Sequence, residues 1–248
     1  MTFPLILHFW HYSIGFHLVT DFLSTTVGVW LYWRSRTDDG VSDEKRDYIL
    51  IGAALGALIG SRLIGALENP ILFIHPPALL YYYASKTIIG GIAGGILGTE
   101  LMKLIIKHKR STGDRVTIPL IVAIIIGRIG CLFTGITDGT VGDICHLAWC
   151  FNQGDGVPRH PISLYEIIFL IIFLLLILYI KRKRWTEGVL FRVFVMSYFT
   201  LRFFIEYIKP THIFALSFSI TQIVCLLYVL WYTYDIYRIA HRYEFRRQ

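Results

Sequence analysis

Charged residues are scarce in this chain. They make up 17% of its 248 residues, whereas hydrophobic residues make up 55%, and the mean hydropathy is +0.57. This composition is typical of polytopic membrane proteins and argues against a soluble enzyme, in which about 25% of residues are charged. The formal net charge is +7, but the basic residues lie in short loops between apolar runs, so we expect no nucleic-acid partner.

Targeting and metal-binding signals are also absent. Residues 1–33 contain neither a basic n-region nor a small-residue cleavage site before Arg34, so we expect no cleavable signal peptide. His8, His11 and His17 lie close together in the sequence, but their spacing matches no strong metal site. No nearby cysteine or pair of carboxylates completes such a site. We therefore expect no metal and no cofactor.

Seven apolar stretches are long enough to cross a membrane. Residues 1–10 are apolar but too short to cross, and we expect them at the membrane interface. Solenoid-type repeats and low-complexity segments are absent, so residues 1–248 are expected to form a single integral membrane domain. The sequence thus predicts an all-α polytopic protein with transmembrane helices at residues 13–33, 48–67, 86–106, 117–134, 162–180, 187–207 and 214–236.

The basic residues are distributed unevenly between the loops. Seventeen lysines and arginines lie in the loops and tail on one side of the predicted membrane, whereas Lys86, Arg159 and Lys209 lie on the other side. Because lysine and arginine favour the cytoplasmic side, we expect the N-terminus outside and the C-terminus in the cytoplasm. Residues 135–161 are then the longest outer segment, and we expect them to fold as an extracytoplasmic cap over the site.

Three arginines lie inside apolar stretches: Arg62, Arg128 and Arg202. An arginine at the centre of a membrane helix costs roughly 2.5–3.5 kcal/mol on insertion scales, so it persists where it reaches water or holds an anion. Under the predicted topology all three lie in the outer halves of their spans, and a guanidinium suits phosphate oxygens. We expect them to face a phospholipid headgroup. The alternative is pairing with an internal carboxylate, Glu206 for Arg202 and Glu68 for Arg62.

Two further groups of residues are candidates for chemistry. Tyr198, Arg202 and Glu206 follow one another at four-residue spacing and therefore share one helical face, where the phenol can orient a phosphate or a leaving group. His160 is a candidate acid or base at the outer surface. Glu166 is expected to point inward, either for structural pairing or for catalysis.

The cysteines and glycines have simpler interpretations. Cys145 and Cys150 lie in the outer segment, where a disulfide is permitted. Cys131 lies three residues after Arg128. No base is evident beside it, so we favour a packing role. Gly90, Gly94 and Gly98 repeat every fourth residue, and small residues on one face allow a neighbouring helix to approach closely.

Taken together, these motifs resemble the prolipoprotein diacylglyceryl transferase family. The resemblance implies a multi-pass transferase of the bacterial inner membrane. Such an enzyme moves a diacylglyceryl group from phosphatidylglycerol to the lipobox cysteine thiol of a preprolipoprotein, and it releases glycerol phosphate. The implied partners are phosphatidylglycerol, the signal peptide of the preprolipoprotein and membrane lipid. The matching pieces are Gly60-Ser61-Arg62-Leu63, residues 90–95, Gly127-Arg128-Ile129-Gly130 with Gly139, Arg159-His160-Pro161 with Leu164-Tyr165-Glu166, and Tyr198 with Arg202, Phe203 and Glu206.

The resemblance also implies roles for individual residues. Arg128 and Arg202 would hold the phosphate and stabilise the leaving group, with Tyr198 and His160 as further catalytic residues. The substrate-binding residues that it implies are Arg62, Gly139, Arg159, Glu166 and Glu206.

Four positions depart from the family pattern. Ile89 stands where the family has a histidine, Cys131 replaces an asparagine, Ile136 replaces a glutamate and Ser163 replaces a glutamine. In a divergent transferase, His160, Asp138 or a substrate phosphate oxygen would then accept the thiol proton. Two alternatives are a non-catalytic protein that binds phospholipid or a partner protein, and a transferase with a different acceptor.

Overall fold

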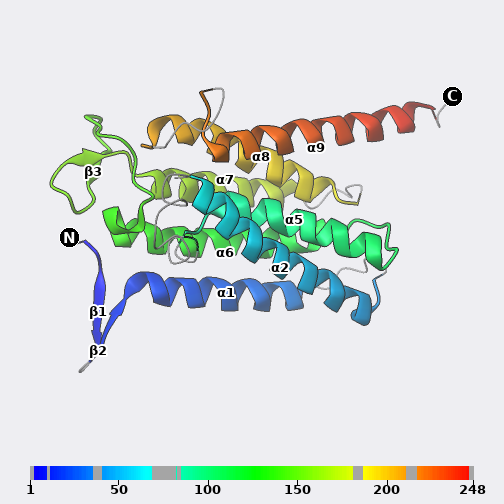
Figure 1. The fold of residues 1–248 in the computed structure, drawn as a ribbon, viewed down its shortest axis with the longest axis horizontal. Helices are drawn as coiled ribbons and strands as arrows, with labels where there is room; N and C mark the ends of the chain where they lie inside the picture. The colour runs from blue at the N-terminus through cyan, green and yellow to red at the C-terminus, as the bar shows by residue number, and fades with distance from the viewer. Residues whose placement is uncertain are drawn as a thin grey trace. The chain divides into compact units, whose positions relative to one another are not determined.

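The computed structural model describes residues 3–9, 12–35, 41–68, 82, 85–180, 187–210 and 217–245. Within these residues the chain forms seven helices of 17 residues or more, with only short strands beside them (Figure 1). Each helix overlaps one predicted span, and the all-helical fold class is confirmed. The helices are α1 (Phe16–Arg34), α2 (Asp43–Leu67), α5 (Ile88–Ile105), α6 (Gly113–Thr134), α7 (Ile162–Ile180), α8 (Val189–Ile205) and α9 (Ile220–Phe245).

Four of the described helical segments are long and apolar enough to cross a membrane: Asp43–Leu67, Ile88–Ile105, Gly113–Asp138 and Ile162–Tyr179. Helix α7 shows why. One of its faces is buried, whereas Ile168, Ile172 and Leu175 on the other face are 48–62% exposed in the protein alone, as expected for side chains that contact lipid. That α1, α8 and α9 also cross the membrane, and that the N-terminus lies outside, stay predictions.

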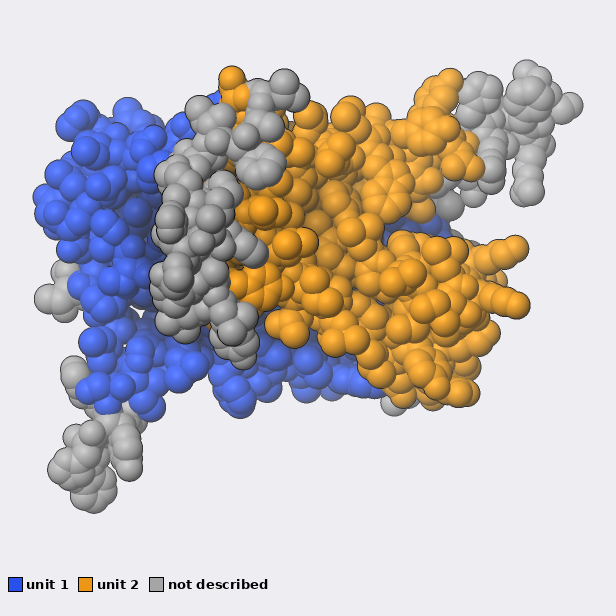
Figure 2. Space-filling view, in the orientation of Figure 1, with its two compact units in different colours: residues 1–37, 112–191, 207–210 blue, residues 38–111, 192–206, 211–248 orange. Residues whose placement is uncertain are grey.

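The chain divides into two compact units, which Figure 2 shows in different colours. Unit 1 comprises Met1–Thr37, Thr112–Phe191 and Tyr207–Pro210, and unit 2 comprises Asp38–Ser111, Arg192–Glu206 and Thr211–Gln248. Each unit combines segments that are far apart in the sequence. The single membrane domain over residues 1–248 stays a prediction.

In unit 2, helices α2 and α5 pack through glycines. A Cβ atom at Gly56 would collide with the backbone carbonyl of Gly94, and one at Gly94 would collide with the carbonyl of Gly56. Gly60 and Gly90 are related in the same way. The predicted packing role of the α5 glycines is therefore confirmed, because only glycine allows these two backbones to approach so closely.

In unit 1, α1 packs along α6. The hydroxyl of Ser24 donates a hydrogen bond to the carbonyl oxygen of Ala123 at 2.7 Å. Near the other end of this contact, a Cβ atom at Gly130 would collide with the side chain of Thr20. These contacts fix the first turns of α1 against the last turns of α6, where Arg128 and Cys131 lie.

The N-terminal residues differ from the prediction. We expected a span to begin at residue 13, but α1 begins at Phe16, and strands β1 (Ile6–Phe9) and β2 (Tyr12–Gly15) form an antiparallel hairpin before it. The backbone N–H of Leu5 donates to the carbonyl of Phe133, which ties the hairpin to the end of α6. Hydropathy did not reveal this hairpin, because its residues are as apolar as those of the helix.

The predicted outer segment, residues 135–161, contains several short elements of secondary structure, and its location outside the membrane stays a prediction. It begins with a short 3-10 helix, η1 (Gly135–Asp138), and contains strands β3 (Phe151–Asn152) and β4 (Pro158–Arg159). Cys145 and Cys150 form a disulfide, as the sequence had allowed. That this segment caps the site stays a prediction.

Candidate functional site

Arg128 lies in a buried ion pair. Its Nε atom donates to Oε2 of Glu166 at 2.9 Å, and the side chains are 6% and 0% exposed. Helix α6 supplies the arginine and α7 supplies the glutamate. Glu166 thus points inward, as expected, and it takes the structural pairing that the sequence had left open. A buried guanidinium without such a carboxylate would be strongly destabilising, so Glu166 holds Arg128 in place.

Arg202 is paired in the same way within unit 2. Its Nη2 atom donates to Oε2 of Glu206 at 3.1 Å, again with side-chain exposures of 6% and 0%. Tyr198 is fully buried and stacks on Phe194, with ring centroids 5.9 Å apart. The predicted face of Tyr198, Arg202 and Glu206 is confirmed as one buried strip. The alternative pairing of Arg202 with Glu206 is the arrangement observed.

Arg62 has a different neighbourhood. Its Nη1 atom donates to the carbonyl oxygen of Ser85 at 3.1 Å. Glu68, the alternative partner proposed for Arg62, accepts a hydrogen bond from Thr221 at 2.8 Å. Arg62 and Arg202 belong to unit 2, whereas Arg128 belongs to unit 1. That the three arginines lie in the outer halves of membrane spans and face a phospholipid headgroup stays a prediction.

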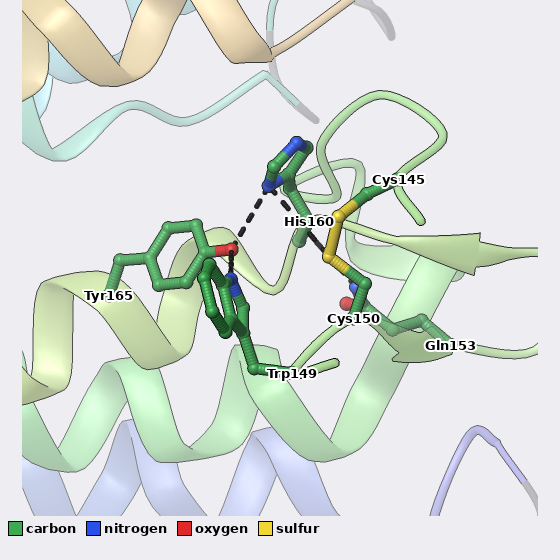
Figure 3. Close-up of a disulfide and its surroundings, with 6 residues drawn as sticks. All are labelled: Cys145, Trp149, Cys150, Gln153, His160 and Tyr165. Carbon is green, nitrogen blue, oxygen red and sulfur yellow. Dashed lines mark hydrogen bonds between the residues drawn. A yellow bond between two sulfur atoms is a disulfide. The ribbon is translucent and has the colours of Figure 1, made fainter. Parts of the chain in front are cut away.

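His160 belongs to a hydrogen-bond chain in the outer segment (Figure 3). The indole N–H of Trp149 donates to the hydroxyl of Tyr165 at 3.0 Å, and this hydroxyl lies 3.0 Å from Nδ1 of His160. Because the indole is only a donor, the hydroxyl accepts from it, and the same hydroxyl is hydrogen-bonded to Nδ1 of His160. This arrangement gives His160 a structural role, and its catalytic role stays a prediction.

Gly139 and Arg159 shape the same segment. Gly139 ends η1 with φ at +69°, and a Cβ atom there would meet no neighbour, so backbone conformation rather than space favours glycine. Arg159 donates from Nε to Oδ2 of Asp155 at 2.6 Å and from Nη1 to the carbonyl of Gly142 at 3.3 Å. The hydrogen bond from Arg159 lowers the pKa of Asp155. Substrate binding by Gly139 and Arg159 stays a prediction.

His17 lies beside Cys131 and Asp138, in a cluster that the sequence does not predict. Its Nε2 atom lies 3.6 Å from Sγ of Cys131 and 3.1 Å from Oδ1 of Asp138, and its Nδ1 atom lies 3.1 Å from Oδ2 of Asp21. The statement that no base lies beside Cys131 is therefore wrong. Sequence spacing indicates only local partners for His17, whereas Cys131 is 114 positions away. The one local signal was the spacing of His17 and Asp21, which places both on one face of α1.

Comparison with known proteins decides the family. A sequence profile described as prolipoprotein diacylglyceryl transferase matches residues 4–237, which is most of the chain. The chain belongs to the prolipoprotein diacylglyceryl transferase family. No solved structure matches it.

Three relatives are each named phosphatidylglycerol–prolipoprotein diacylglyceryl transferase. The protein of Geobacter sulfurreducens is 30% identical, over 70% of this chain and 66% of its own length. The protein of Pseudoalteromonas translucida is 33% identical, over 74% of this chain and 72% of its own length. The protein of Bordetella parapertussis is 30% identical, over 83% of this chain and 79% of its own length. The similarity is modest, but it extends over most of each protein.

The departures of this transferase-family chain have physical consequences. Ile89, for which the sequence resemblance implies a histidine in the family, is fully buried in α5 and offers no proton acceptor. Ser163 is buried, and its hydroxyl oxygen lies 3.3 Å from that of Thr140. Cys131 lies next to both Arg128, at 3.8 Å from Nη1, and His17. A side chain that could accept a proton is therefore absent at position 89, whereas His17 supplies one beside Cys131.

Proposed function

We propose that this chain transfers a diacylglyceryl group from phosphatidylglycerol to the lipobox cysteine of preprolipoproteins. The observation that carries the proposal is the family match over residues 4–237, which includes the buried Arg128. We place the enzyme in the bacterial inner membrane as a multi-pass protein, with the site on the outer side. The Cys145–Cys150 disulfide supports an oxidising compartment for the outer segment.

The proposed reaction is a displacement at carbon. The sulfur of the acceptor cysteine attacks the glycerol carbon that carries the phosphate, and a C–S bond forms while the C–O bond to phosphate breaks. The products are a thioether and glycerol phosphate, and the thiol proton is released. Negative charge develops on the leaving phosphate, so a fixed guanidinium nearby lowers the barrier.

The arginines fit this role because they are held before substrate arrives. Glu166 accepts a hydrogen bond from Arg128 at 2.9 Å, and Glu206 accepts one from Arg202 at 3.1 Å. A guanidinium has five N–H donors in a rigid fork, so it can keep a carboxylate and also bind phosphate oxygens. In this mechanism the two glutamates act as positioning residues, and Tyr198 and Arg62 assist in binding the headgroup.

The test uses labelled phosphatidylglycerol and a lipobox peptide with the purified protein. Arg128→Lys keeps a positive charge opposite Glu166 but removes the fork, so we expect it to fold and to lose at least about tenfold in transfer. Arg192→Lys is the matched control, because Arg192 also pairs with a carboxylate, Asp235 at 2.9 Å, and takes no part in the proposed site. Equal activity of the two variants would refute the role of Arg128.

One observation favours a second candidate. The buried Ile89 removes a proton acceptor that the family pattern contains, as expected for a protein that binds the phospholipid without transferring it. Folded wild type that retains phosphatidylglycerol but modifies no lipobox peptide would support this binding role. Modification of another thiol under the same conditions would instead indicate a different acceptor.

A further inference from the structure

Three side chains with different donor atoms converge at the end of α6. They are His17 from α1, Cys131 from α6 and Asp138 from η1, all within unit 1. The imidazole Nε2, the thiol Sγ and a carboxylate oxygen all lie within 4.8 Å of one another. Nitrogen, sulfur and oxygen ligands of these three types are those that zinc uses in proteins.

The separations match the edges of a zinc tetrahedron. With Zn–N of about 2.0–2.1 Å and Zn–S of about 2.3 Å, tetrahedral angles place nitrogen and sulfur about 3.5–3.6 Å apart. Nε2 of His17 and Sγ of Cys131 are 3.6 Å apart. A nitrogen and an oxygen ligand should be about 3.3–3.4 Å apart, and Nε2 of His17 lies 3.1 Å from Oδ1 of Asp138. Little movement is needed to place a zinc ion between them.

Each of the three side chains also has a second partner behind it. Asp21 lies 3.1 Å from Nδ1 of His17, so it can accept a hydrogen bond from Nδ1–H and direct the lone pair of Nε2 toward the other two side chains. Thr140 donates to Oδ2 of Asp138 at 2.5 Å, on the oxygen that does not face His17. Nη1 of Arg128 lies 3.8 Å from Sγ of Cys131. Such outer partners orient the ligands in known metal sites.

We infer that His17, Cys131 and Asp138 bind one zinc ion and leave its fourth position open. A thiolate together with an imidazole selects zinc over magnesium or calcium, which prefer oxygen ligands. Three protein ligands with an open fourth position are typical of catalytic rather than structural zinc sites. The side chains of His17 and Asp138 are 30% and 14% exposed, so a further ligand can reach the ion.

The ligand that this open position would take is a thiol, and this part of the inference rests on the proposed function. Zinc deprotonates a thiol that coordinates it. The acceptor cysteine would lose its proton to water, bind the ion as a thiolate and attack the lipid carbon. The resulting thioether is a weaker ligand than the thiolate and would leave. The ion would thus supply the activation of the thiol that Ile89 does not provide.

Metal binding is tested first, without reference to activity. Purified protein is incubated with zinc sulfate, desalted and measured by elemental mass spectrometry. We expect about one zinc per chain in wild type and loss of this zinc in His17→Ala, Cys131→Ala and Asp138→Ala. Two control variants should keep it. Cys225→Ala removes a buried cysteine of α9 that is not in the disulfide, and His146→Ala removes an exposed histidine of the predicted outer segment.

A variant that keeps all three ligands guards against misfolding. Asp21→Asn should bind zinc about 10–100-fold more weakly than wild type, because it weakens only the orientation of His17. Cobalt(II) in place of zinc should show a sulfur-to-metal charge-transfer band in wild type and Asp21→Asn, but not in Cys131→Ala. Wild type that retains no more zinc than the three ligand variants would overturn the site, and His17 would then be an imidazolium between two carboxylates.

Transfer assays separate the metal site from the proposed function. We expect chelation of zinc to stop transfer and added zinc to restore it. Transfer that is unchanged after the zinc has been removed would overturn the role of the ion. Absence of transfer in zinc-loaded protein would refute the transferase activity and leave the metal site standing.

Discussion

The buried pair of Arg128 and Glu166 allows a double-mutant test of stability and function together. The pair joins α6 to α7 at 2.9 Å, with side chains only 6% and 0% exposed. Removal of one partner leaves a buried charge without compensation, which costs about 3–5 kcal/mol. We therefore expect Arg128→Leu and Glu166→Leu each to lower the free energy of unfolding by this amount.

The double variant should behave differently. Replacement of both members of a buried pair by apolar residues is often neutral or stabilising by about 1–4 kcal/mol. The double variant should therefore be more stable than either single variant, although additive effects would total about 6–10 kcal/mol of loss. Transfer from phosphatidylglycerol should nevertheless be lost, because the guanidinium is gone. From Arg128→Leu to the double variant, stability should therefore recover while transfer stays lost.

Two measurements check this prediction: unfolding in detergent micelles followed by tryptophan fluorescence, and transfer of labelled lipid to a lipobox peptide. Stability losses that simply add would show that Arg128 and Glu166 are not coupled as the structure has them. Transfer by a stable double variant would show that Arg128 does not act on the phosphate.

Three further predictions concern packing and the outer segment. Gly94→Ala should destabilise the protein by about 1–3 kcal/mol through overpacking. Gly91→Ala should be tolerated, because its Cβ would lie 3.7 Å from the nearest atom. Thermal unfolding of both variants measures this difference in stability. Replacement of Cys145 and Cys150 by serine should cost about 2 kcal/mol, as expected for a closed loop of about six residues, and should speed proteolysis of the outer segment. Tyr165→Phe removes the hydroxyl between Trp149 and His160 and should lower the stability of the outer segment by about 1 kcal/mol, with transfer retained.

Hydropathy located the helices because membrane spans are long and uniformly apolar. Pairing also followed from the sequence for Arg202 and Glu206, since four-residue spacing on a helix brings two side chains together. The glycine spacing of α5 predicts close approach of a neighbouring helix, but it does not identify α2 as that helix. The hairpin before Phe16 was missed because apolar strands and apolar helices have the same composition over a few residues.

The environment of Cys131 was the main failure of sequence reasoning. The partners of a side chain in a helical membrane protein come from other helices, and sequence spacing reports only contacts within one helix. His17 reaches Cys131 because α1 packs against the end of α6 through contacts such as that of Gly130 with Thr20. The sequence contained every residue of this cluster, but nothing in it indicated which helices are neighbours.

Formation of a thioether from phosphatidylglycerol distinguishes a transferase from a protein that only binds the lipid. It can be measured by mass spectrometry of a lipobox peptide after incubation with the wild-type protein and phosphatidylglycerol deuterated in its diacylglyceryl group. We expect a peptide whose cysteine carries the deuterated group through a thioether bond, which survives alkaline conditions that hydrolyse esters, together with released glycerol phosphate. An unmodified peptide, from folded protein that still binds the lipid, would refute transferase activity.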